Sequence, residues 1–233
     1  MIDWAVIAGA LPDFIQGLQI TLLLLAMSLA TGFVLAIPLA TMRVSRHRWL
    51  SVPVWLYTYV IRGTPLLVQL IIIYTGLPQL GLPRLDVLQS ALLGLVLNEA
   101  AYLSEILRGG ILSVPTGQKD AALALGLSRS KAFVLVTMPQ AMRVIVPALG
   151  NSVNGLLKTT SIASVISMEE LLRRGQILMQ QRFEVLEIFV CVAIIYLVMT
   201  TGWEAIQRRI EAHYGKAFAA REVETKQLAR DDR

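Results

Sequence analysis

Polar and ionisable side chains in the middle of an apolar stretch are the residues of this chain best suited to chemistry. At 100° per residue, Asn98, Tyr102 and Glu105 fall within about 60° of one another on a helix, and Glu99 lies at the edge of this stripe. A charge in hydrocarbon is costly unless it is paired or hydrated. The stripe therefore predicts the lining of a solute pathway. For Glu105, a structural ion pair with Arg108 three residues later is the equal alternative.

The preceding apolar stretch contains a helix-breaking sequence, Gly63-Thr64-Pro65. Pro65 has no N–H to donate, and Gly63 permits unwinding. Exposed backbone groups at membrane depth persist only where they line a cavity or are buried in protein. We therefore add Arg62, Gly63, Thr64 and Gln69 to the predicted pathway, with a simple packing kink as the alternative.

A third polar run, Lys158-Thr159-Thr160-Ser161, lies in a later apolar stretch that also contains Gly150, Asn151 and Ser152. Lipid cannot surround so many polar groups, so this stretch must face protein or water. Lys158, Thr160 and Ser161 are predicted to form the opposite wall of the pathway.

Five hydrophobic helices are needed to position these residues. The 233 residues are 55% apolar and only 16% charged, which is typical of a helical membrane protein and not of a soluble domain. The predicted spans cover residues 14–42, 53–77, 86–112, 140–167 and 184–207, and a short surface helix is expected within 168–184. The single cysteine, Cys191, excludes an internal disulfide.

A polar insert at residues 117–139 separates the third and fourth spans. Its first part predicts a short helix that Gly126 ends in a left-handed conformation. Ser128 is a suitable N-cap for a second helix over 129–137, and Pro139 is expected to separate that helix from the fourth span. Such a compact soluble element between two spans indicates a docking site, with an unpartnered helical hairpin as the alternative.

The orientation follows from the basic residues, because cytoplasmic loops of membrane proteins are enriched in Lys and Arg. Fourteen of the 21 basic residues lie in the first loop, the central insert and the tail: Arg43, Arg46, Arg48, Lys119, Arg129, Lys131, Arg143, Arg208, Arg209, Lys216, Arg221, Lys226, Arg230 and Arg233. This distribution predicts an outside N-terminus, a cytoplasmic C-terminus, a transmembrane domain over 1–213 and a solvated, partly disordered tail over 214–233. It also explains the net charge of +5 without a nucleic-acid partner.

The insert resembles a signature of ABC importer permeases, in which Glu-Ala-Ala is followed after three residues by Gly and after nine more by Ile-x-Leu-Pro. Here Asp120-Ala121-Ala122, Gly126 and Val136-Thr137-Met138-Pro139 keep that spacing, with Asp, Val and Met as conservative departures. In that family the loop is a coupling helix that inserts into a groove of the ATPase. The resemblance implies that Asp120, Ala121, Ala122 and Gly126 are coupling residues.

Three further segments are similar to the polar amino-acid uptake permeases, which serve histidine, lysine, arginine, glutamine, glutamate and opines. They are Arg62-Gly63-Thr64-Pro65, Glu99-Ala100-Ala101-Tyr102 and Leu157-Lys158-Thr159-Thr160-Ser161-Ile162. Thr159 stands where that family commonly has Asp, which weakens the expectation of a cationic substrate side chain. An amino-acid carboxylate would suit the broken helix, and its ammonium would suit Glu99 or a carbonyl.

The resemblance implies a type I ABC importer (MetI-like) permease in a bacterial inner membrane, with no catalytic, cofactor or metal site of its own. Because the chain has no GxxxxGK[ST] loop, ATP and Mg²⁺ would be bound by a separate ATPase dimer. The other implied partners are a second permease chain, a periplasmic or lipid-anchored substrate-binding protein, a polar amino acid and membrane lipid. The alternative is an ion-coupled secondary transporter that works without an ATPase. An intramembrane enzyme is disfavoured, because HExxH, GxSxG and Cys/His clusters are missing from the sequence.

Overall fold

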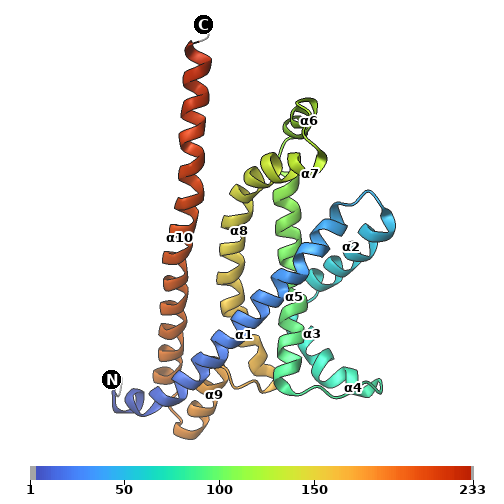
Figure 1. Cartoon of the computed structure of the whole chain (residues 1–233). Helices are drawn as coiled ribbons and strands as arrows, with labels where there is room; N and C mark the ends of the chain where they lie inside the picture. Colours follow the sequence, from blue (N-terminus) through green and yellow to red (C-terminus); the bar gives the residue numbers. More distant parts are fainter. Residues whose placement is uncertain (1–3, 232–233) are drawn as a thin grey trace.

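The computed structural model describes residues 4–231, and its regular elements are all helical (Figure 1). The long helices are α1 (Trp4–Val44), α2 (Arg48–Gly63), α5 (Val87–Leu112), α8 (Met138–Thr159) and α10 (Val185–Asp231); the short ones are α3 (Leu66–Ile71), α4 (Leu77–Gln79), α6 (Thr116–Ala124), α7 (Arg129–Ala132) and α9 (Leu171–Arg182). Two π-helical turns, Ile72–Gly76 and Phe133–Thr137, and a 3₁₀ segment, Thr160–Ile166, connect some of them.

The number of spans agrees with the prediction. Four helical segments, 9–44, 87–112, 129–166 and 185–212, are long and apolar enough to cross a membrane, and the bent pair 48–63 and 66–79 makes a fifth. The start of the second span differs from the prediction. Helix α2 begins at Arg48, so Pro53, where that span was predicted to begin, lies inside the helix. The turn before α5 falls at Gly81, whose φ is +78°, because the helix continues through Gly76 to Gln79.

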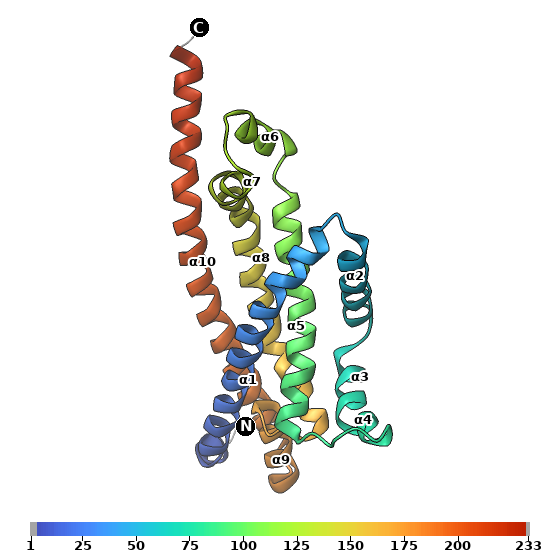
Figure 2. The ribbon, with the colours of Figure 1, turned by 45° about the vertical axis from the view of Figure 1, so that its right-hand side comes forward.

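Helix α5 is the centre of the bundle, and α1 packs along it more extensively than any other pair of elements (Figure 2). Gly32 of α1 allows this close approach, since a Cβ at that position would lie 3.1 Å from the Cβ of Glu99. Leu24, Leu70, Leu95 and Leu156 form the main core cluster, which joins α1, α3, α5 and α8. The polar stripe of α5 is therefore placed among four helices.

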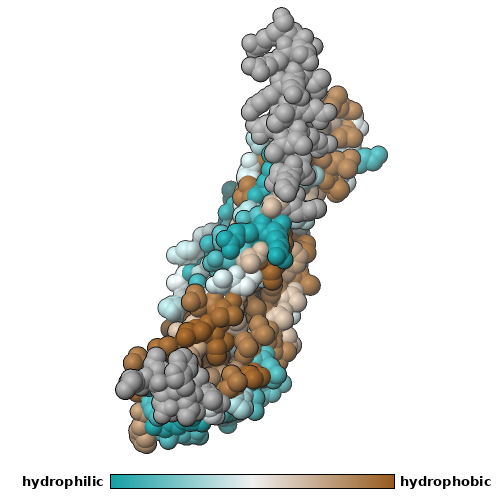
Figure 3. Space-filling model, turned by 90° about the vertical axis from the view of Figure 1, so that its left-hand side faces the viewer, coloured by the Kyte–Doolittle hydropathy of each residue, from teal (hydrophilic) through white to brown (hydrophobic). Residues whose placement is uncertain are grey.

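The two ends of the molecule carry different elements. In Figures 1 and 2 the start of α1, α4 and α9 lie at one end, and α6, α7 and the last part of α10 lie toward the other. Between them, Figure 3 shows apolar residues gathered on the face that carries α10, with hydrophilic residues on either side. Leu197 and Val198 of α10 expose 64% and 65% of their surface there. Lipid is the natural partner of such a surface in a membrane-spanning helix.

The insert has the predicted helix–turn–helix form. Gly126 has φ +84° and ends α6 with two bonds, from its own amide to the Leu123 carbonyl and from the Leu127 amide to the Ala122 carbonyl. This pair of bonds is a Schellman motif, which favours glycine at its left-handed position. Ser128 caps α7 by accepting the Lys131 amide, as predicted.

Pro139 does not separate the insert from the fourth span, and this part of the prediction is wrong. The helix runs from Arg129 through the π-helical turn into α8, with Pro139 in the first turn of α8. In the π-helical turn the Met138 amide bonds the Phe133 carbonyl, so the register has already shifted where the proline N–H is missing. The chain bends there without a break (Figures 1 and 2).

The predicted helix within 168–184 exists as α9, and it buries one of its faces in the molecule. Leu171 is 0% exposed and Leu178 is 3% exposed, and both pack with Phe14 of α1 and Ile188 of α10. The Leu171 amide also donates to the Thr21 hydroxyl, 150 residues away in sequence. Helix α9 therefore packs against both α1 and α10 at one end of the molecule.

Glu170 fixes the position of α9 relative to α10. Its carboxylate is fully buried and accepts bonds from the amides of Leu172 (2.9 Å) and Arg173 (2.8 Å) and from the Tyr196 hydroxyl of α10 (3.0 Å). Burial raises the pKa of Glu170, whereas these bonds favour its ionised form. The residue is at once the N-cap of α9 and its link to α10.

Helix α10 continues to Asp231, across the predicted domain boundary at 213/214. The tail is rich in Ala, Glu, Lys, Arg and Gln, which are strong helix formers. Its partial disorder stays a prediction. Whether 1–213 and 214–233 act as separate units stays a prediction.

We expect Glu170→Ala to destabilise the protein by about 2 kcal/mol or more, because three buried donors lose their acceptor. Thermal unfolding of the detergent-purified protein, followed by tryptophan fluorescence, measures the effect. Glu169→Ala is the matched control, because Glu169 is 55% exposed and forms only a surface ion pair with Arg174. Equal melting temperatures for the two variants would contradict this role of Glu170.

Candidate functional site

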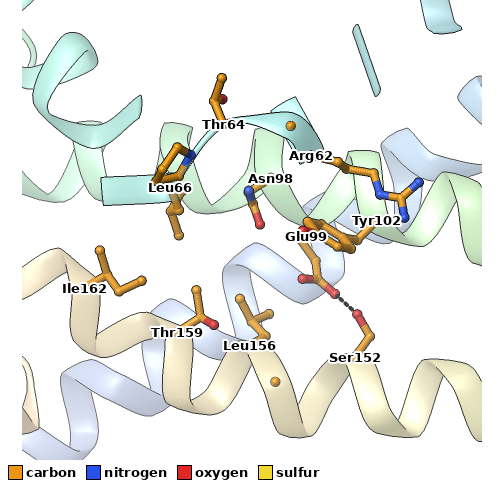
Figure 4. Close-up of a pocket in the computed structure, with 13 residues that line it drawn as sticks. Arg62, Thr64, Leu66, Asn98, Glu99, Tyr102, Ser152, Leu156, Thr159 and Ile162 are labelled. Carbon is orange, nitrogen blue, oxygen red and sulfur yellow. Dashed lines mark hydrogen bonds between the residues drawn. The ribbon is translucent and has the colours of Figure 1, made fainter. Parts of the chain in front are cut away.

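The candidate site is a cavity of about 550 Å³ between the break after α2, the middle of α5 and α8 (Figure 4). Its lining is polar at the centre and apolar at the edge: Arg62, Gly63, Thr64, Pro65, Leu66, Asn98, Glu99, Tyr102, Ser152, Gly155, Leu156, Thr159 and Ile162. Six of the predicted pathway residues meet here, namely Arg62, Gly63, Thr64, Asn98, Glu99 and Tyr102. The volume suits a small organic solute.

The first wall is the break itself. Helices α2 and α3 meet at an angle of 103°, with Thr64 and Pro65 in extended conformation between them. Gln69 was predicted to line the pathway, but it is absent from the cavity lining. Its amide nitrogen donates to the Ile61 carbonyl (2.7 Å) and to the Thr64 carbonyl (3.2 Å) and hydroxyl (2.9 Å). These hydrogen bonds from Gln69 therefore stabilise the backbone at the break.

The Gln69 hydrogen bonds decide which backbone groups at the break remain available to a solute. Carbonyls at the end of α2 are occupied by Gln69, so they are less available to a cation. At the start of α3, the amides of Val68 and Gln69 bond the Pro65 carbonyl, and the amides of Leu66 and Leu67 have no acceptor within the helix. Leu66 lines the cavity, so its amide is a donor at the break that suits an anion.

The second wall carries the one acidic group of the cavity. Glu99 is 4% exposed, and its carboxylate accepts a bond of 2.8 Å from the Ser152 hydroxyl of α8. Asn98 and Glu99 point from α5 into the space between the broken helix and α8 (Figure 4). Gly32 of α1 lies behind Glu99 and leaves no room for it to retreat. The carboxylate is therefore held at the cavity, and among the described residues Ser152 alone donates a hydrogen bond to it.

Arg62 and Tyr102 form the third feature of the cavity. The guanidinium carbon of Arg62 lies 5.0 Å from the centre of the Tyr102 ring, in a cation–π contact (Figure 4). The Arg62 side chain is 42% exposed. A cation from α2 and a carboxylate from α5 thus line the same cavity.

Glu105 lies outside this cavity, one helical turn beyond Tyr102. It pairs with Arg108 at 2.7 Å, as the structural alternative predicted. Arg43 at 3.5 Å and Arg62 at 3.9 Å also approach it, which the sequence did not reveal because they come from other helices.

The fourth span lines the cavity with a different face of its helix from the one predicted. Lys158 is exposed, Thr160 is buried with its hydroxyl on the Leu157 carbonyl, and Ser161 bonds the Lys158 carbonyl. None of these three lines the cavity. Ser152, Gly155, Leu156, Thr159 and Ile162 do, and their spacing of three and four residues places them on one helical face. A helical projection of this span would have found them.

The residues of the insert divide between surface and interior. Asp120, Ala121 and Gly126 are exposed, but Ala122 is 4% exposed and packs within the chain. Small size at that position therefore serves the packing of α6 on its own molecule. Leu125, which the sequence did not single out, is 85% exposed beside the Gly126 turn.

Within residues 4–231, no cluster of three or more His, Cys, Asp or Glu side chains is placed to hold a metal ion. The arrangement is one of recognition, with a carboxylate, a guanidinium, hydroxyls and backbone donors around a cavity.

Comparisons with known proteins match this geometry to a family. Residues 10–216 match the model described as "Binding-protein-dependent transport system inner membrane component". The chain is 42% identical over 193 residues to the octopine transport system permease protein OccM of Rhizobium radiobacter, covering 79% of each. It is 39% identical over 211 residues to the glutamine transport system permease protein GlnP of Escherichia coli (strain K12), covering 90% of this chain and 96% of that protein.

A solved structure agrees with these relatives. The crystal structure of an amino acid ABC transporter with histidines matches with a TM-score of 0.86 at 35% identity, over 91% of this chain and 99% of that chain. The resemblance to polar amino-acid ABC permeases and the type I importer fold are thereby confirmed. The chain belongs to the family of inner-membrane components of binding-protein-dependent transport systems, and it is a permease subunit.

Proposed function

We propose that this permease carries a polar amino acid or a related opine through the cavity between the broken helix, α5 and α8, driven by a separate ATPase. The observation that carries the proposal is the pairing of anion donors at the break with the buried carboxylate of Glu99 across one cavity. The printed names of the relatives, which include octopine, glutamine and amino acid transport, support this substrate class. They give no support to the ion-coupled alternative.

The geometry suits a zwitterion. The substrate carboxylate would accept from the first amides of α3, and Arg62 lies on the same side of the cavity. The substrate ammonium would bind Glu99, whose Ser152 bond fixes one oxygen and leaves the other. Asn98 and Thr159 are neutral donors and acceptors for the substrate side chain. With Thr159 in place of a carboxylate, the site favours a neutral polar side chain over a cationic one.

Two further parts of the proposal concern the partners. The exposed Asp120, Ala121, Leu125 and Gly126 would dock on an ATPase dimer that binds ATP and Mg²⁺, with Gly126 setting the angle of α6. A second permease chain would close the open side of the cavity, and a substrate-binding protein would deliver the solute at the other end. Since α6 and the end of α10 lie toward one end of the molecule, we infer that this end is cytoplasmic and that the N-terminus is outside.

Reconstitution tests the substrate class directly. The chain is co-purified with its ATPase, partner permease and binding protein, placed in liposomes, and assayed with individual amino acids and opines. We expect ATP hydrolysis to rise with at least one polar amino acid or opine, and uptake of that compound to follow. If none of them stimulates hydrolysis, or if the purified chain transports without an ATPase, the proposed function is wrong.

Glu99→Gln should lower uptake about tenfold or more, because the substrate ammonium loses an ionic partner of a kind that contributes about 1.5–3 kcal/mol. The variant keeps the size of the side chain and an oxygen for Ser152, so the fold should survive. Uptake of the stimulating amino acid is compared with Glu204→Gln, which makes the same change at an exposed position of α10. Equal uptake by the two variants would remove Glu99 from the site.

Gly126→Val should uncouple ATP hydrolysis from transport while leaving membrane insertion intact. A β-branched residue is strained at φ +84°, although an added Cβ would meet no neighbouring atom within 4 Å. The loss therefore comes from the turn and not from a clash. The readout is uptake per ATP hydrolysed in the reconstituted complex.

Two controls isolate this effect. Gly126→Asn should retain coupling, because asparagine tolerates the left-handed conformation. Gly117→Val should also retain it, because Gly117 is exposed in the same insert and needs no positive φ. Normal coupling in Gly126→Val would count against the docking role of the insert.

A further inference from the structure

A second cavity lies beside the first, farther along α5 toward the insert. It has a volume of about 280 Å³ and is lined by Arg43 of α1, by Trp55, Thr58, Tyr59, Arg62 and Gly63 of α2, and by Glu105 of α5. Glu105 is six residues after Glu99, so the second cavity is about 9 Å farther along the helix axis. Arg62 and Gly63 line both cavities.

The charges around this cavity do not balance. Arg43, Arg62 and Arg108 surround one carboxylate, that of Glu105, whose side chain is only 13% exposed. Arg108 takes one oxygen of that carboxylate, Oε2, with both Nε (2.9 Å) and Nη2 (2.7 Å). The other two guanidiniums are left with looser contacts of 3.5 and 3.9 Å. Three cations thus share one anion, and two of them have hydrogen bonds to give.

Arg43 shows the surplus most clearly. Within the described part of the chain its buried Nε has no hydrogen-bond partner, and neither has Glu105 Oε1, although the two face each other at 3.5 Å. At 3.5 Å this ion pair is too long for a good hydrogen bond, so Arg43 Nε can still donate to an acceptor that lies closer. A carboxylate is the group whose geometry a guanidinium matches best.

Among the described residues, the contacts of Arg62 leave its guanidinium N–H groups able to donate to a solute. The cation–π contact with Tyr102, at 5.0 Å from the guanidinium carbon to the ring centre, uses none of the guanidinium N–H groups as a donor to an oxygen (Figure 4). Its contact with Glu105 at 3.9 Å is an ion pair beyond hydrogen-bond distance. Trp55 and Tyr59, on the same helix as Arg62, stack at 5.4 Å and supply an apolar part of the lining.

We propose that this second cavity is a transient binding site for the carboxylate of the transported solute, with Arg43 and Arg62 as its ligands. The proposal rests on the proposed function, because it concerns the same solute. Arg62 reaches both cavities, so a carboxylate that leaves the first site can move to Arg43 without losing its cationic partner. Glu105 holds the guanidiniums in place and, by competing for them, keeps the solute from binding too tightly to leave.

Arg43→Gln tests the proposal, because Arg43 does not line the first cavity. In the reconstituted complex, uptake per ATP hydrolysed should fall about tenfold or more for the amino acid that best stimulates the wild-type complex. Arg43→Lys should retain part of the activity, since it keeps the charge. Arg46→Gln is the matched control, because Arg46 is an exposed arginine three residues later, in the loop after α1, and its uptake should be unchanged.

A second experiment needs neither a variant nor the natural substrate. The purified wild-type complex is treated with phenylglyoxal, which modifies arginine, in potassium acetate or in potassium chloride of equal ionic strength. Mass spectrometry then gives the modification of each arginine. Acetate, as the carboxylate probe, should slow the modification of Arg43 and Arg62 several-fold and leave that of Arg46 unchanged.

The outcomes separate the two proposals. Equal protection of Arg43, Arg62 and Arg46 by acetate, or unchanged uptake per ATP in Arg43→Gln, would overturn the second site. A wild-type complex that no amino acid or opine stimulates would overturn the proposed function, and the acetate experiment would still decide whether the arginine cluster binds carboxylates.

Discussion

The structure depends on one constraint, that hydrocarbon offers no hydrogen-bond partners and every polar group at membrane depth must find them within the protein. Glu170 meets it with two amides and a tyrosine, and Glu99 with Ser152. At the break after α2, Gln69 satisfies the carbonyls of one helix but not the first amides of the next. The residual donors of the break face a cavity, where a solute can take them.

Helix α5 joins the parts of this account. It carries Glu99 at the first cavity and Glu105 at the second, and it leads at Leu112 toward α6 in the insert. Near its end, Gly110 lies so close to α8 that a Cβ there would collide with Ile145. A displacement of α6 by a partner would therefore reach both α5 and α8, which are two of the three walls of the first cavity.

Much of the fold followed from local sequence, because hydropathy, a left-handed glycine and a serine cap depend only on nearby residues. The span over 86–112, Gly126 and Ser128 were placed correctly for this reason. Residues whose partners come from elsewhere were not. Gln69 donates to the backbone at the break and does not line the cavity. Ala122 packs on its own chain. Pro139 follows a π-helical turn that lets the helix continue. Arg43 joined Glu105 across two helices, which no spacing in the sequence could show.

The central claim, that an amino acid passes through the cavity between the broken helix, α5 and α8, is tested most directly by an experimental structure of the assembled complex. The complex would be trapped with a non-hydrolysable ATP analogue and the amino acid that stimulates it. The account predicts density for that amino acid in this cavity, with its ammonium at Glu99 and its carboxylate at the start of α3. Density for the amino acid at another place in the membrane, with this cavity closed by side chains, would contradict it.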